Sequence, residues 1–232
     1  MTVRSHSKVR CPSCFMSGAL CLCAELKPIS TRTHVAIVMH YAEAKTSSNT
    51  GRLAHQLLIN SEIRLRGGPG RPFHADGLIE AHLEPLILFP SENAIELTPE
   101  FVKTLQRPVT LIVPDGNWSQ ARKVLNREPA LREARPVKLP PGPPSCYRLR
   151  TAPREEAVCT MEAIARALRV LEAERGIEVE DHLMGAFNKM VERVLWSRGE
   201  LKTEDSLTGI PQEAVDHRQI SGFPKDKRPQ EN

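Results

Sequence analysis

The residues best suited to chemistry gather in one short turn, residues 115–118, which contains Asp115 and Trp118. The turn follows the apolar, β-branched run 109–113, which predicts a buried strand, and Pro114 should end that strand because proline cannot donate to a β-ladder. Open α/β sheets bind ligands at the carboxyl ends of their strands. Asp115 could therefore act as a general base or orient a reacting group, whereas the alternative interpretation is an Asx turn beside a core tryptophan.

A second candidate site lies near the N-terminus, where a Cys-x-x-Cys pair is followed by a Cys-x-Cys pair. Four thiolates can close a tetrahedral zinc site, and a site with all four positions filled by sulfur leaves no room for substrate. The sequence therefore predicts a structural zinc knuckle within residues 1–30, with a redox pair or chance clustering as the alternatives. The predicted ligands are Cys11, Cys14, Cys21 and Cys23.

Apolar runs and helical patterns alternate along the chain, and these elements must position both sites. The runs predict strands too apolar to face water on one side, at residues 34–40, 63–65, 85–90, 109–113 and 136–139. Helices are expected to begin near Thr50, Thr98, Asn117 or Ser119, Thr160 and Glu180. This order predicts an α/β fold with a mostly parallel sheet and helices on both faces, over residues 31–198. Residues 199–232 are expected to form a disordered tail, because they combine proline and charge with few apolar residues.

Charge is distributed unevenly along the 232-residue chain, whose net charge is +4. Residues 103–154 carry 11 Lys or Arg against 3 Asp or Glu, a net charge of +8. A basic block beside the candidate turn suggests a polyanionic partner, with an ordinary solvated face as the alternative. Arg52 lies at the start of a predicted helix that Asn49 or Thr50 would cap, so it could add to an anion site there.

Several classes of protein are excluded by patterns that the sequence lacks. Neither Gly-x-Gly-x-x-Gly nor a P-loop motif occurs, which argues against an ordinary dinucleotide or nucleoside-triphosphate fold. No apolar run is long enough to span a membrane, and the N-terminus lacks the apolar core of a signal peptide. We therefore expect a cytoplasmic protein that does not bind a membrane, and nothing in the sequence indicates an obligate protein partner.

Four motifs together resemble a single protein family. Residues 115–121, Asp-Gly-Asn-Trp-Ser-Gln-Ala, are similar to the signature of the DTW-domain proteins, the tRNA-uridine aminocarboxypropyltransferases. The other three motifs are the four-cysteine N-terminus, the run 49–52 with His40 and Glu43 before it, and the run 147–150 followed by 159–163. Their order and spacing match the family over roughly residues 11–196. Asn117 replaces the threonine that gives the family its name, and it keeps a side chain able to cap a helix.

The resemblance implies a trefoil-knotted α/β fold similar to that of the SPOUT RNA methyltransferases. It also implies S-adenosylmethionine as the donor, tRNA as the partner, and transfer of the 3-amino-3-carboxypropyl group to N3 of a uridine with release of methylthioadenosine. Two alternatives stay open. One is an enzyme that transfers a methyl group or acts on ribosomal RNA, and the other is a zinc-knuckle RNA-binding protein without catalysis.

The resemblance suggests roles for individual residues as well. Asp115 would be the general base or an orienting group, and Trp118 would stack on a flipped base or pack in the core. The donor's carboxylate would meet the free N–H groups at the start of the helix at Thr160, together with the guanidinium of Arg148 or Arg150. The donor-binding set is Leu88, Phe89, Pro90, Val113, Pro114, Gly116, Tyr147, Arg148, Arg150, Thr160, Met161 and Glu162. Basic side chains would hold tRNA phosphates, namely Arg52, Arg122, Lys123, Arg127, Arg132 and Arg135.

Overall fold

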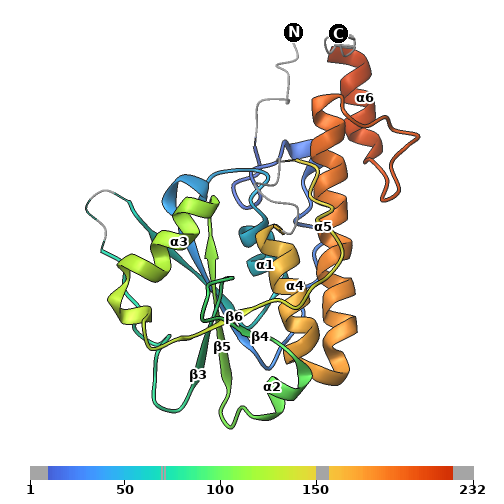
Figure 1. Ribbon diagram of the computed structural model, residues 1–232. Helices are drawn as coiled ribbons and strands as arrows, with labels where there is room; N and C mark the ends of the chain where they lie inside the picture. Colours follow the sequence, from blue (N-terminus) through green and yellow to red (C-terminus); the bar gives the residue numbers. More distant parts are fainter. Residues whose placement is uncertain (1–9, 69, 71, 150–156, 222–232) are drawn as a thin grey trace, which may run out of the picture.

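The computed structural model describes residues 10–68, 70, 72–149 and 157–221, and its centre is a single parallel sheet (Figure 1). The strands of this sheet lie in the order β2-β1-β5-β3-β6-β4, and every neighbouring pair is parallel. Their bounds are β1 His34–His40, β2 Ser61–Arg66, β3 Glu84–Leu88, β4 Ile95–Glu96, β5 Val109–Asp115 and β6 Arg135–Lys138. The predicted α/β class with a parallel sheet is confirmed.

Helices cover both faces of the sheet, as the sequence predicts (Figure 1). Alternate residues of β1 point to opposite sides: Val35 and Ile37 join the larger core, and Ala36 and Val38 join the smaller one. Both cores exclude water, which explains why the central strands β1 and β5 are buried on both faces. The larger core contains α1 (Thr50–Leu57), α4 (Thr160–Leu171) and α5 (Gly176–Arg198), and the smaller core contains α3 (Trp118–Arg127). The short helix α2 (Pro99–Lys103) contacts α4.

β5 runs further than the sequence predicts, through Pro114 to Asp115. Both residues pair with β1, where Val38 lies opposite Pro114 and Met39 lies opposite Asp115. The ladder with β3, on the other side, ends earlier at Ile112. The expectation that the strand stops at Pro114 is therefore wrong. β3 no longer pairs with β5 at this point, so the missing N–H group of Pro114 can interrupt only the ladder with β1.

The junction between α4 and α5 depends on one glycine. A short 3-10 turn, Ala173–Arg175, follows α4, and α5 begins at Gly176, earlier than the predicted start near residue 180. A Cβ atom on Gly176 would lie 1.9 Å from the carbonyl oxygen of Arg169, so only glycine allows the two helices to approach this closely. α5 ends as predicted at Gly199, which has a positive φ of 79°.

Residues 199–221 dock on α5, and the prediction of a disordered tail is wrong for this segment. It contains helix α6 (Gln212–Ser221). Glu192 on α5 accepts hydrogen bonds from the N–H and hydroxyl groups of Thr208 at 2.9 and 2.6 Å. The guanidinium of Arg218 lies 4.6 Å from the ring centroid of Trp196. The polar composition suggested disorder, but these polar groups form hydrogen bonds with α5. The rest of the predicted tail, residues 222–232, lies outside the described residues.

Within the described ranges, none of the helices combines the length and the apolar character needed to cross a membrane. The trefoil knot, which the family resemblance implies, stays a prediction.

Candidate functional site

Asp115 occupies the junction of three elements: the carboxyl end of β5 and the N-terminal ends of α1 and α4. Its Oδ2 atom accepts a hydrogen bond from Nδ2 of Asn49 at 2.8 Å, and its Oδ1 atom accepts one from Oγ1 of Thr160 at 2.5 Å. The residue is only 5% exposed. The carboxylate is therefore held in one orientation by donors from two separate parts of the chain.

The approach of α1 to this carboxylate requires a small residue. A Cβ atom on Gly51 would lie 3.0 Å from Cγ of Asp115, so a larger residue would push the carboxylate away. Asn49 also caps α1, because its Oδ1 atom accepts a hydrogen bond from the Arg52 N–H at 2.6 Å. The N-terminal ends of two helices favour a negative charge at this point. Asn49 thus makes two contacts: its oxygen caps α1, and its amide group donates to Asp115. The sequence predicted the first contact and not the second.

The turn that follows Asp115 is fixed by a capping box. Asn117 caps α3, as predicted: Oδ1 of Asn117 accepts from the Gln120 N–H at 2.9 Å, and Oε1 of Gln120 accepts from the Asn117 N–H at 2.7 Å. Gly116 has a φ of 153°, and a Cβ atom there would lie 2.7 Å from Oε1 of Gln120. Glycine at this position therefore permits both the turn and the reciprocal cap.

Trp118 lies at the first position of α3 and packs against Phe89. Its ring centroid is 5.1 Å from that of Phe89, which follows β3, and the ring planes are tilted by 38°. Phe89 is buried, while Trp118 is half-buried. The contact shows that the ring packs on Phe89, and stacking of Trp118 on a base stays a prediction.

Glu162 connects the loop around Tyr147 to the start of α4. Its carboxylate accepts hydrogen bonds from the Ser145 hydroxyl at 2.6 Å and from the N–H groups of Cys146 and Cys159 at 2.7 and 2.8 Å. Burial acts to raise the pKa of Glu162, but these hydrogen bonds outweigh it and lower the pKa below its ordinary value. The hydroxyl of Tyr147 donates to the Ser48 carbonyl at 2.7 Å. The structure thus brings the motif at Tyr147 beside the N-terminal ends of α1 and α4.

The residues predicted to bind the donor occupy different environments. Met161 has no exposed surface and packs in the larger core. The Glu162 carboxylate already accepts hydrogen bonds from Ser145, Cys146 and Cys159. Pro90 and Arg148 are exposed, and Arg150 lies outside the described residues. The buried members at the carboxyl ends of β3 and β5 are Leu88, Phe89, Val113 and Pro114. Thr160 contributes its hydroxyl to Asp115, a contact that the sequence reasoning, which assigned only its backbone, missed.

The predicted phosphate-binding residues divide into two groups. Arg122, Lys123 and Arg127 are exposed on α3, and they form no ion pair within the parts of the chain that the structure describes. Arg132, just after α3, is also exposed. By contrast, Arg135 pairs with buried Glu84 at 2.7 Å. Arg52 is half-buried with its guanidinium 4.3 Å from the Phe15 ring, and burial lowers its pKa. Among the described residues, these two arginines therefore have side-chain contacts with other groups, and the side chains of the other four basic residues have none.

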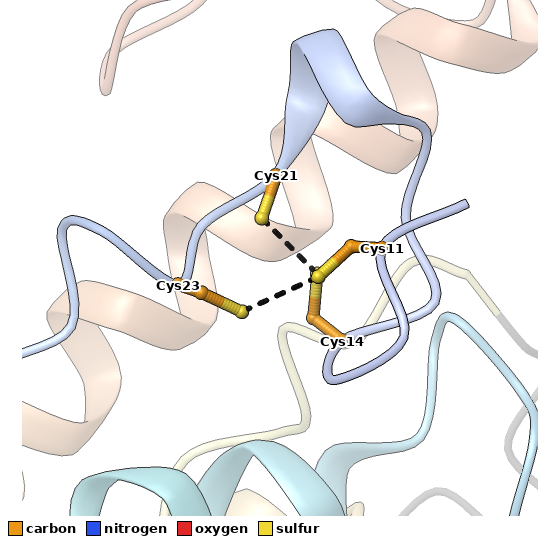
Figure 2. A group of neighbouring side chains, drawn as sticks. All are labelled: Cys11, Cys14, Cys21 and Cys23. Carbon is orange, nitrogen blue, oxygen red and sulfur yellow. Dashed lines mark hydrogen bonds between the residues drawn. The ribbon is translucent and has the colours of Figure 1, made fainter. Parts of the chain in front are cut away.

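The four N-terminal cysteines converge in space, as Figure 2 shows, and their ligand atoms all lie within 4.8 Å of one another. The Sγ atoms of Cys11 and Cys23 are 3.7 Å apart, as are those of Cys14 and Cys21. A tetrahedron with Zn–S bonds of about 2.3 Å has S···S edges of about 3.8 Å. Two of the six S···S separations match this edge and the others stay within 4.8 Å, so the cluster could hold a tetrahedral zinc ion.

The thiols of this cluster have unequal acidities. A hydrogen bond from the Cys14 backbone lowers the pKa of Cys11 to about 6, whereas burial raises the pKa of Cys21. Burial and neighbouring sulfurs raise the pKa of Cys23 above its usual range. Four thiolates this close repel one another unless a cation lies between them. The donor set is therefore suited to a divalent metal.

Helix α5 holds the cysteine knuckle against the main domain. The buried Arg193 donates to the Cys21 carbonyl at 3.0 Å and to Oε1 of Glu25 at 2.5 Å. Met16 and Leu22 from the knuckle belong to the same apolar core as α1 and α5. The knuckle and the main domain consequently share one hydrophobic core.

Comparisons with known proteins agree with these features. The family model of the DTW domain matches residues 8–195. The chain is 32% identical over 170 residues to a Drosophila melanogaster protein named tRNA-uridine aminocarboxypropyltransferase 2, and the alignment covers 71% of this chain and 67% of that protein. Proteins of the same name from Macaca fascicularis and Mus musculus are 28% and 29% identical over 72% and 75% of this chain.

The chain spans 58% and 60% of the macaque and mouse proteins. No solved structure matches it significantly. The family model nevertheless covers the knuckle, the Asp115 turn and most of α5, which are the parts from which the site is built. The chain belongs to the DTW-domain family.

Proposed function

We propose that this protein transfers the 3-amino-3-carboxypropyl group of S-adenosylmethionine to N3 of a uridine in tRNA. The observation that carries the proposal is the junction at Asp115, where the carboxylate joins the segments around Asn49 and Thr160 at the carboxyl end of β5. Parallel α/β sheets bind their ligands at this edge. The names of the relatives support the same reaction and the same class of RNA.

The proposed reaction is a displacement at carbon. Uracil N3 loses its proton to water, and its electron pair forms a bond to the γ-carbon of the aminocarboxypropyl group. The bond between that carbon and the sulfonium sulfur breaks, and its electron pair stays on sulfur, giving neutral methylthioadenosine. The protein must hold the two reactants in line, because positioning supplies much of the rate of such a step.

Asp115 would position this reaction rather than remove the proton. Both of its oxygens already accept hydrogen bonds, from Asn49 and Thr160, and donors that stabilise a carboxylate make it a weaker base. The donor's own carboxylate would lie at the N-terminal end of α4, near the exposed Arg148. A charged, oriented carboxylate at Asp115 is well placed to bind the positive amino or sulfonium group of the donor.

The remaining parts of the molecule would support this site. Zinc bound by the four cysteines would stabilise the N-terminal knuckle, residues 1–30, on the catalytic domain, residues 31–198. The exposed basic residues of α3 would hold tRNA phosphates close to the Asp115 turn, since that helix begins at the turn. We include the trefoil knot and a cytoplasmic location in the same proposal.

Two labelled forms of the donor test the proposed function. Unmodified tRNA is incubated with the protein and with S-adenosylmethionine labelled either in its carboxyl group or in its methyl group. The proposal expects carboxyl label in the RNA, with a nucleoside whose mass matches aminocarboxypropyluridine. Methyl label in the RNA would indicate a methyltransferase. RNA binding without transfer of either label would indicate a non-catalytic RNA-binding protein.

A further inference from the structure

His40 is the last residue of β1 and lies next to the Asp115 turn. Its neighbour Met39 pairs with Asp115, so His40 lies beside Gly116. A Cβ atom on Gly116 would be 3.4 Å from Cβ of His40. The His40 side chain is half-buried at the carboxyl edge of the sheet, the same edge at which Asp115 is held.

The hydrogen bonds around His40 fix its neutral tautomer. Its Nδ1 atom lies 3.1 Å from Nε2 of Gln120 and 3.3 Å from the Ala42 N–H. Gln120 cannot turn its amide around, because its Oε1 atom accepts from the Asn117 N–H in the capping box. Nε2 of Gln120 must therefore donate, and Nδ1 of His40 must accept. The proton of neutral His40 consequently lies on its Nε2 atom.

The Nε2–H group of His40 is left without an acceptor among the described residues. Gly67 lies close to this nitrogen: a Cβ atom there would be 3.2 Å from Nε2, so a larger residue would crowd the donor edge of the imidazole. Gly67 has a positive φ of 80°, which also favours glycine at this place. The exposed ring of Tyr41 lies beside the imidazole, with the ring centroids 5.0 Å apart. The half-buried imidazole therefore presents an oriented donor beside an aromatic ring at the carboxyl edge of the sheet.

We propose that His40 is a catalytic residue whose Nε2–H donates a hydrogen bond to a carbonyl oxygen of the target uracil, and that Gln120 is a positioning residue that fixes this tautomer. The inference rests on the proposed function. When N3 loses its proton to water, the negative charge spreads onto the O2 and O4 oxygens of the base. A donor aimed at one of them stabilises the charge more strongly than it stabilises the neutral base, which lowers the barrier to formation of the N3–carbon bond.

Two substitutions of His40 separate this role from a structural one. Asparagine reaches the position of Nδ1 and can accept from Ala42 and Gln120, but it has no atom at the position of Nε2. Glutamine reaches the position of Nε2 with an N–H donor. We expect His40→Asn to lower kcat on saturating tRNA by about 10²-fold, the usual effect of losing such a donor, and His40→Gln to stay within about tenfold of the original protein. The tRNA dissociation constant should not change in either variant, and the melting temperature should not change in His40→Asn, which keeps the acceptor for Ala42 and Gln120.

Each outcome of this experiment is decisive. Normal turnover of His40→Asn would overturn the inference, since the side chain would then only cap the turn at Ala42. Equal losses in both variants would overturn it too, because restoring the donor would have no effect. Imidazole ¹⁵N NMR of the unsubstituted protein gives a readout that does not depend on activity, and a proton on Nδ1 would contradict the assigned tautomer. Absence of carboxyl-label transfer by the unsubstituted protein would instead refute the proposed function.

Discussion

The cysteine knuckle and the Asp115 junction are both clusters of partly buried polar groups, but the chain assembles them differently. The four sulfurs come from one segment between Cys11 and Cys23. Asp115 is instead held by Asn49, 66 residues before it, and by Thr160, 45 residues after it. The knuckle therefore depends on local spacing and has the sulfur ligands to hold an ion, whereas the junction exists only once β5, α1 and α4 have packed together.

This difference separates stability from chemistry. Four sulfurs around an ion fill a tetrahedral site and leave no position for a substrate. The junction has polar groups at the carboxyl edge of the sheet, where β1 also ends at His40, and the helix with exposed basic side chains begins beside it. We therefore expect that damage to the knuckle mainly lowers stability, and that damage to the junction mainly lowers turnover.

The largest expected effect is the loss of the knuckle. Cys14→Ser removes a buried ligand and should abolish stoichiometric zinc, because a serine hydroxyl is a poor replacement for a thiolate. We expect the free energy of unfolding to fall by about 3 kcal/mol or more, since metal binding contributes directly to folding and the knuckle shares the main core. Elemental analysis and denaturant unfolding measure the two effects.

Cys146→Ser is the matched control for this experiment. Cys146 is an exposed thiol outside the cluster, and a serine there can still donate to Glu162 as the thiol does. It should keep the full zinc content and change stability by less than about 0.5 kcal/mol. Equal destabilisation by both substitutions, or full zinc content in Cys14→Ser, would contradict the metal assignment.

An intermediate effect is expected at Glu162, which holds the Tyr147 loop to α4. Glu162→Gln keeps the shape but replaces an acceptor with a donor that faces the Cys146 or Cys159 N–H. We expect a loss of about 1–3 kcal/mol in the free energy of unfolding near pH 7. Denaturant unfolding of both proteins measures it.

The pH dependence of that loss follows from the pKa of Glu162, which is lower in the folded state than its ordinary value of 4.5. A carboxyl group of this kind contributes its full stabilisation above the unfolded pKa, and the contribution is lost as the pH falls through the folded pKa. The difference between the original protein and Glu162→Gln should therefore be constant above about pH 5.5 and shrink below pH 4.5. A difference that grows in acid would show that the carboxylate is not stabilised by the fold.

The smallest effect on stability is expected on α3. Substituting Arg122 and Arg127 together by alanine should leave the melting temperature and donor affinity unchanged, because both side chains are exposed. tRNA binding should weaken, and the slope of log K against log salt should flatten by about 0.7 to 0.9 for each lost phosphate contact. Arg175→Ala is the control, since Arg175 is exposed but lies beyond the other end of α4 and pairs with Glu178. An unchanged salt slope in the double variant would move the RNA surface away from α3.

Local patterns predicted the parts of the fold that local physics decides. Strand positions, the Asn117 cap and the end of α5 at Gly199 follow from apolar periodicity and backbone preferences within a few residues. The extension of β5 through Pro114 could not be predicted this way, because it depends on where the neighbouring strand ends. The docking of residues 199–221 could not be predicted for a related reason. Polar groups of this segment form hydrogen bonds with Glu192 of α5, a partner that local patterns do not identify.

The candidate site shows the same limit. The sequence singles out Asp115 from its position in a turn after a strand, but the side-chain amide of Asn49 and the hydroxyl of Thr160 become its partners only in the folded chain. The contact between Gln120 and His40 links residues 80 positions apart. A capping box signals that Gln120 is oriented, yet nothing in the sequence says toward which group.

Asp115 provides the most direct test of the account as a whole. Asp115→Asn keeps the size of the side chain, and its amide can still meet one of the two donors, so the protein should stay folded with at most about 1–3 kcal/mol lost. The measurement is kcat for transfer of carboxyl label from S-adenosylmethionine to saturating tRNA, made beside a thermal melt of the same sample. We expect a fall of about 10²-fold or more in a folded protein that keeps its zinc content, because the charge that positions the donor is lost. Near-full turnover by this variant would show that the junction is structural and that the chemistry lies elsewhere.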